Sequence, residues 1–276
     1  MKTDLRSTNT SPAVAHFSER SIYVATLLIF GLAATVTIYF SQTMTGSMRM
    51  PGRWTMSMMW VTMPGQSWFR ATLVFAGMWL AMMITMMLPS TLPILFLYRR
   101  ATAFRGESHL ALLTFVLGAG YFLVWLLFGV VVYAMGRSIT NAAMKWVAVS
   151  RTVPFAAAVA LILAGSYQLT SWKMACLKHC RDPLELVAHH LGGGSRGAFR
   201  LGLHHGAFCA ACCWALMLIQ LVLGVMSLTV MVGVAAIIAF EKLFTRGETV
   251  ARIIGTISVL AGIVQAVISV IGLKGA

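Results

Sequence analysis

Long apolar blocks separated by short polar segments dominate the chain. The blocks are about 20 residues long, which is the length that crosses the hydrocarbon core of a bilayer as a helix. They do not alternate in ten-residue units as the strands of a membrane β-barrel do. We therefore predict an all-α, polytopic transmembrane helical bundle of about seven spans, at residues 21–40, 70–98, 109–134, 153–172, 203–223, 225–241 and 250–272. A tight turn without a charged residue joins the fifth and sixth blocks, so six spans with one re-entrant segment remain an alternative.

Composition agrees with this pattern. Of the 276 residues, 59% are hydrophobic and 10% are charged, whereas soluble domains carry about 25% charged residues. The first block is longer than the apolar core of a signal peptide and lacks a small-x-small cleavage site after it, so we expect it to be a retained span. The chain is therefore predicted to be an integral membrane protein.

The net charge of +14 reflects topology rather than nucleic-acid binding, because the basic residues lie scattered between apolar blocks without a dense aromatic-interleaved patch. A cytoplasmic N-terminus places about two-thirds of the 21 Lys and Arg on the cytoplasmic side. We predict a membrane protein with a cytoplasmic tail at 1–20 and a transmembrane domain at 21–276. That domain has a methionine-rich outer loop at 41–67 and a cytoplasmic cysteine-bearing loop at 173–201.

The start of the fifth span, "GLHHGAFCAACCWALM", concentrates soft side chains on one face. His205, Cys209, Cys213 and Met217 follow at i+4 steps, and Cys212 lies beside them. Imidazole, thiolate and thioether groups bind copper(I) and zinc. The stripe therefore indicates half of a soft-metal site, although cysteines that only pack are the alternative.

The segment "CLKHC" supplies two further thiols, Cys176 and Cys180, on one helical face if the fourth helix continues that far. The charge-based topology brings all five cysteines to one level, near the cytoplasmic face. Five sulfurs exceed the four ligands of a closed structural site, so this pool favours handover of a metal between partly occupied sites.

Methionines of the second span supply thioether donors or a transfer path toward the same level, namely Met82, Met83 and Met86, although core packing explains them as well. Glu241 is the nearest acid, and a snorkelling pair with Lys242 at the interface is its alternative interpretation. Methionines of the outer loop could capture copper(I), and an interfacial segment anchored by tryptophans is the competing explanation.

Several functions lose support because their motifs are missing from the sequence. It contains no nucleotide-binding, kinase, hydrolase or H-E-x-x-H motif. Its acidic residues lie outside the predicted spans or at their ends, which disfavours a proton-coupled pump. No catalytic residue is predicted.

The blocks "WLAMMITMMLPSTLP", "WKMACLKHCRDPLE" and "GLHHGAFCAACCWALM" through "AFEKLF" resemble a bacterial family of predicted metal-binding integral membrane proteins, a domain of unknown function. The resemblance covers about residues 78–244. It implies metal binding without a reaction, and this chain departs from the family pattern at Leu88 and Leu92. The positions that it marks are Met82, Met83, Met86, Pro89, Lys173, Cys176, Cys180, Gly206, Cys209, Cys212, Cys213, Trp214, Met217, Glu241 and Lys242.

The leading hypothesis is a bacterial inner-membrane protein that binds a soft metal ion, copper(I) first and zinc second, near its cytoplasmic face and delivers it to a partner metalloprotein. The candidate ligands are Cys209, Cys212, Cys213, Cys176, Cys180, Met82, Met83, Met86, His205, Met217 and Glu241. Two rivals stay open. The same thiols would also serve a membrane thiol–disulfide carrier, or they would only pack in a scaffold subunit.

Overall fold

The computed structural model describes residues 12–44, 46–61, 65–107, 109–182, 184, 187–188 and 193–274, with the backbone alone at 12–21. Residues 1–11 of the predicted cytoplasmic tail, and His189 and His190 of the predicted cysteine-bearing loop, lie outside this set. The all-α prediction is confirmed. The helices are α1 (Pro12–Thr43), α2 (Trp68–Phe104), α3 (Leu110–Lys145), α4 (Val147–Gln168), α5 (Ser171–Arg181), α7 (Gly194–Gly224), α8 (Leu228–Leu243) and α9 (Gly247–Lys274), with a 3-10 turn η1 (Met58–Trp60).

Six of the described helices are long and apolar enough to cross a membrane, which makes the chain a multi-pass membrane protein. Their outward faces carry large apolar side chains, for example Leu27 at 69%, Phe115 at 70% and Ile271 at 66% exposure. Lipid covers such faces, whereas water would not tolerate an apolar surface of this extent. The predicted span at 225–241 corresponds to α8, whose 16 residues rise only about 24 Å.

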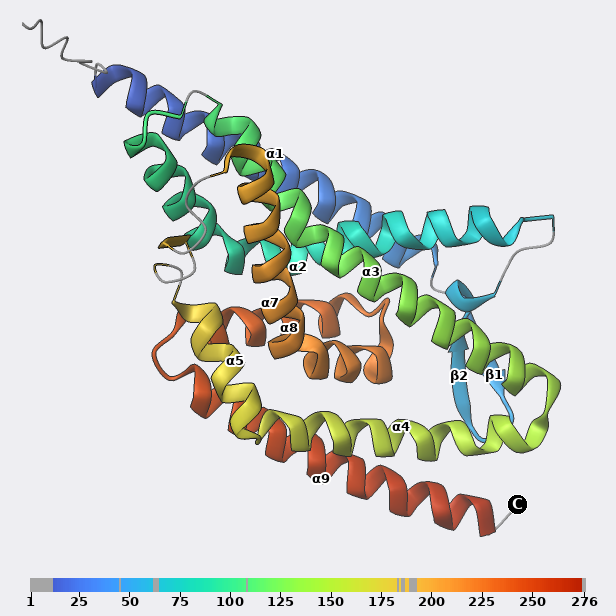
Figure 1. Cartoon of the computed structure of the whole chain (residues 1–276). Helices are drawn as coiled ribbons and strands as arrows, with labels where there is room; N and C mark the ends of the chain where they lie inside the picture. The colour runs from blue at the N-terminus through green and yellow to red at the C-terminus, as the bar shows by residue number, and fades with distance from the viewer. Residues whose placement is uncertain are drawn as a thin grey trace, which may run out of the picture.

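Close helix contacts hold the site in place. α3 crosses α7, and α9 runs along α4 (Figure 1). A Cβ at Gly120 of α3 would lie 2.6 Å from the Phe199 carbonyl oxygen of α7, and one at Gly165 of α4 would lie 2.6 Å from the Gly255 carbonyl oxygen of α9. Glycine therefore permits the backbone-to-backbone packing that membrane bundles use.

The predicted outer segment contains a β-hairpin, β1 (Ser47–Met50) with β2 (Trp54–Ser57), the only sheet in the described part of the chain. Met50 pairs with Trp54 across the turn, where Gly52 and Arg53 both have positive φ. The Trp54 indole donates to the Ser150 carbonyl oxygen at 2.9 Å, and the Ser150 hydroxyl donates to the Pro51 carbonyl oxygen at 2.7 Å. The hairpin is therefore fixed to the beginning of α4 (Figure 1).

The two cysteines of "CLKHC" lie on α5, which is a separate helix. α4 ends at Gln168, and the Thr170 hydroxyl caps α5 by accepting from the Lys173 backbone amide. The expected continuation of the fourth helix is thus wrong in detail, because a new N-cap interrupts it. The bend turns Lys173 and Leu177 inward, where both are fully buried.

Candidate functional site: a buried cysteine cluster with two lysines

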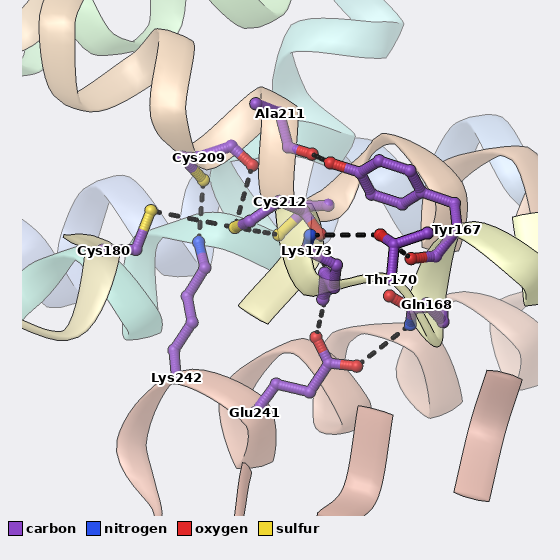
Figure 2. Close-up of polar contacts among 11 residues, drawn as sticks. Tyr167, Gln168, Thr170, Lys173, Cys180, Cys209, Ala211, Cys212, Glu241 and Lys242 are labelled. Carbon is purple, nitrogen blue, oxygen red and sulfur yellow. Dashed lines mark hydrogen bonds and ion pairs between the residues drawn. The ribbon is translucent and has the colours of Figure 1, made fainter. Parts of the chain in front are cut away.

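Three cysteines of α7 lie in the core, and one of α5 reaches them. Cys209, Cys212 and Cys213 are buried, whereas Cys176 and Cys180 are half-buried. The Cys212 Sγ lies 3.8 Å from the Cys180 Sγ and 3.3 Å from the Cys213 Sγ (Figure 2). The structure therefore brings the two cysteine groups, separated by a loop in the sequence, into contact.

Cys209 faces two polar side chains from other helices. The Lys242 ammonium of α8 donates to the Cys209 Sγ at 2.7 Å (Figure 2), and the Tyr121 hydroxyl of α3 lies 2.9 Å from the same sulfur. Lys242 is 8% exposed and Tyr121 is fully buried. A cation this close to a sulfur in a dry environment stabilises negative charge on that sulfur.

A second buried lysine closes the other side of the cluster. The Lys173 ammonium lies 2.6 Å from the Glu241 Oε2 and also donates to the Cys212 carbonyl oxygen. The Gln168 side-chain amide donates to the Glu241 Oε1 at 3.0 Å. Burial disfavours the charged form of Lys173, but the facing Cys213 and Glu241 outweigh it, so the pKa of Lys173 is raised and the side chain stays charged.

The snorkelling pair that was the alternative interpretation of Glu241 and Lys242 does not form. Adjacent residues on a helix point in different directions, and these two reach different partners, Lys173 and Cys209 (Figure 2). Both are buried, at 1% and 8% exposure. Because both carboxylate oxygens of Glu241 already accept hydrogen bonds, one from Gln168 and one from Lys173, this residue holds Lys173 in place beside the cluster.

The methionines predicted as thioether donors are buried in the same apolar core as the cysteines. Met82, Met83 and Met86 of α2 belong to this core, as does Met217 of α7. The Gln220 amide donates to the Met82 Sδ at 3.4 Å, so at least one of these sulfurs faces α7.

His205 is buried and stacks on Tyr121, with ring centroids 5.3 Å apart. Its Nδ1 has no hydrogen-bond partner within the described structure. Cys176 lies one turn before Cys180 and packs against the same core. His205 and Cys176 lie beside the sulfur cluster, and a metal-ligand role for either residue stays a prediction.

Within the described residues, no group of three or more His, Cys, Asp or Glu side chains converges in a way that could hold a metal ion. The close sulfur contacts are pairwise, Cys212 with Cys180 and Cys212 with Cys213. The geometry therefore offers two-sulfur sites, and Cys209, which contacts Cys212 and Cys213, also accepts a hydrogen bond from Lys242.

The sequence did not reveal most of the polar side chains that surround the cysteines and methionines. Tyr121, Gln168 and Gln220 were not singled out, although each is a polar side chain within or at the end of an apolar span, which is a signal of function or of a buried partner. Lys173 and Lys242 were counted as topology markers and are marked by the family resemblance, and Lys242 was also considered as a snorkelling partner of Glu241, but neither was expected to be buried beside the cysteines.

Comparison with known proteins adds one finding. The model of the PpoB2 family, described as a copper chaperone, matches residues 76–265. No curated protein and no solved structure matches the chain. The matched range contains all the helices that supply the cysteine cluster and its lysines.

Proposed function

The chain belongs to the PpoB2 family of copper chaperones, and we propose that it carries copper(I) on its cysteine cluster and delivers it to a partner metalloprotein. Copper(I) is cargo here, and no catalytic reaction is part of the proposal. The proposed carriers are Cys180, Cys212, Cys213, Cys209 and Cys176.

The sulfur contact between α5 and α7 is the observation that carries the proposal. With metal–sulfur bonds of about 2.3 Å, two sulfurs 3.8 Å apart enclose an angle of about 111° at a shared ion. This angle lies between tetrahedral and trigonal, so Cys180 and Cys212 suit two positions of a three-coordinate ion with little movement, whereas a two-coordinate copper(I), which is near-linear, requires the two sulfurs to separate to about 4.6 Å. Thiolate sulfur suits soft ions, copper(I) and zinc among them.

Ligand number favours copper(I) over zinc. Structural zinc sites use four ligands, and the described residues contain no converging group of even three. Copper(I) accepts two or three sulfur ligands. A pairwise arrangement of thiols therefore supports copper(I) as the cargo and keeps zinc as the second choice.

Charge balance supports the same choice. Glu241 balances Lys173, so Lys242, which contacts the Cys209 sulfur, is the remaining buried cation beside the cluster. Two thiolates, one copper(I) and one ammonium sum to zero, which is the state that a dry core favours. Zinc with the same two thiolates and ammonium would leave a buried positive charge.

The half-buried cysteines of α5 support a delivery role. Cys180 contacts the buried cluster, and Cys176 lies one turn away on a helix that is separate from the spans. Copper(I) could thus pass by ligand exchange from Cys212 to Cys180 and then to Cys176, within reach of a partner. We place this end of the bundle at the cytoplasmic face of a bacterial inner membrane, with the N-terminus in the cytoplasm, as the distribution of Lys and Arg favours.

Anaerobic titration with copper(I) against a competing chelator tests the proposal on protein purified in detergent. We expect Cys212→Ser and Cys180→Ser each to weaken copper(I) binding, because each removes one sulfur of the 3.8 Å pair. Ala210→Ser is the matched control, since it adds a hydroxyl to the same turn of α7 without removing a sulfur. Unchanged copper(I) affinity in both cysteine variants would overturn the proposal.

The thiol–disulfide carrier remains the alternative function. In that case the Sγ atoms of Cys180 and Cys212, now 3.8 Å apart, would approach to about 2.05 Å when they form a disulfide. Trapping of thiols in cells separates the two functions. A copper carrier keeps Cys180 and Cys212 reduced, whereas a redox carrier cycles through an intramolecular disulfide.

A further inference from the structure

A second sulfur-lined feature lies beside the β-hairpin. A pocket of about 270 Å³ opens between the end of α1, η1 and the beginning of α2. Its described walls include four methionines: Met44 directly after α1, Met58 and Met59 of η1, and Met78 of α2.

We propose that this methionine-lined pocket is a loading site where copper(I) enters the protein before it reaches the cysteines. The inference deepens the proposed function and rests on it. Among the described residues that line the pocket, none is acidic or basic, so they offer neutral thioethers to a soft cation and little to a hard one such as Mg²⁺ or Ca²⁺.

Exposure differs among the four methionines in the way that a loading site needs. Met58 is 39% exposed, whereas Met59 and Met78 are 8% and 4% exposed. An ion would therefore meet Met58 near the mouth and Met59 and Met78 deeper in. Thioethers cannot form disulfides, so such a site would also work in an oxidising compartment, where paired thiols do not stay reduced.

A continuous series of thioethers leads from the pocket toward the cysteines. Met78, Met82 and Met86 follow at one-turn steps along α2, each about 6 Å of rise. All three share one buried core with Met59, Met217 and the α7 cysteines. Met217 lies one turn beyond Cys213, so the series ends beside the cluster.

The two sites lie toward opposite ends of the bundle. Trp54 and Ser150 fix the hairpin to the beginning of α4, and the cysteine-bearing α5 follows directly after the end of α4 (Figure 1). The 22 residues of α4 rise about 33 Å, close to the thickness of a bilayer core. The geometry thus assigns the loading pocket and the cysteine cluster to opposite membrane faces.

The first test measures copper(I) stoichiometry and affinity anaerobically, with copper(I) alone as the probe, on the full chain carrying Met58→Leu and Met59→Leu together. Leucine keeps most of the volume and removes the sulfur. We expect the double variant to lose a weak copper(I) equivalent, with affinity there falling by more than about 10-fold, while the cysteine-bound equivalent stays. Met135→Leu is the matched control, since Met135 is 60% exposed on α3.

A second variant separates this inference from the proposed function. With all five cysteines changed to serine, we expect the weak equivalent to persist and to show sulfur-only coordination by X-ray absorption. Unchanged stoichiometry in the Met58→Leu, Met59→Leu protein would overturn the loading site and leave the cysteine site intact. Unchanged tight binding in the cysteine-free protein would overturn the proposed function instead.

Discussion

Lys242 provides the sharpest test of how the cluster holds charge. Its ammonium lies 2.7 Å from the Cys209 sulfur, and both residues are buried. At an effective dielectric constant of about 20, two unit charges at this separation interact by about 6 kcal/mol. Desolvation offsets part of that energy, and removal of one member of a buried pair typically costs about 3–5 kcal/mol.

We expect Lys242→Met to weaken copper(I) binding by roughly a hundred- to a few-thousand-fold, which is that free energy expressed as a ratio of affinities. Methionine fills similar space but leaves a copper(I) bis-thiolate with an unbalanced negative charge in the core. Lys242→Arg keeps the cation and should stay much closer to the wild type. Lys178→Met removes a charge from an exposed position on α5 and should bind copper(I) like the wild type.

The measurement is a competition titration with a copper(I) chelator under anaerobic conditions, with size-exclusion profiles to check folding. An affinity of Lys242→Met within a few-fold of the wild type, with Cys212→Ser clearly weakened, would refute the charge-balance argument. It would mean that water or another cation neutralises the cluster.

Three further outcomes concern stability, each read as the shift of the thermal unfolding midpoint in detergent. Lys173→Met and Glu241→Gln should each lower the free energy of unfolding by about 3–5 kcal/mol, because each leaves a buried charged partner unpaired. The double variant should lose less than the sum of the two single losses. Strictly additive losses would contradict the 2.6 Å ion pair between the two residues. Gly165→Leu should strongly destabilise the protein, since even a Cβ at this position would lie 2.6 Å from the Gly255 carbonyl oxygen. Gly118→Ala should be tolerated, because no atom lies within 4 Å of the added Cβ. Equal unfolding midpoints for the two variants would show that α4 and α9 do not pack closely. Trp54→Phe removes the indole hydrogen bond to Ser150 and should cost about 0.5–1.5 kcal/mol; a zero effect would mean that the hairpin is not fixed to α4.

The positions of the spans followed from apolar length, because lipid imposes one helix length on every crossing segment. The break between α4 and α5 did not emerge, although "QLTSWK" contains an N-cap threonine that marks it. The length of an apolar block averages hydrophobicity over about 20 residues, whereas a single N-cap hydroxyl determines where a new helix begins. The hairpin was missed in the same way, since its "PGR" turn lies among methionines with no long apolar block.

The sulfur side of the site was predictable from spacing on one helix, since i+4 steps place Cys209 and Cys213 together. The contact between Cys180 and Cys212 was not, because the order of helices around a bundle is a tertiary property. The lysines were hidden for another reason. Lys173 and Lys242 follow apolar blocks, where a positive charge normally marks the membrane surface, and only the fold shows that both turn inward.

The burial of Glu241 and Lys242 also bears on how the protein is made. With 16 residues, α8 is too short to span the membrane alone. Its final turn also carries two charged side chains, and exposing a charged side chain to the centre of the bilayer costs about 2.5–3.5 kcal/mol. Both charges find partners on α5 and α7, which are synthesised earlier. We infer that α8 leaves the insertion machinery together with α7 as a helical hairpin, so that Cys209 and its partner Lys242 enter the bilayer in one step.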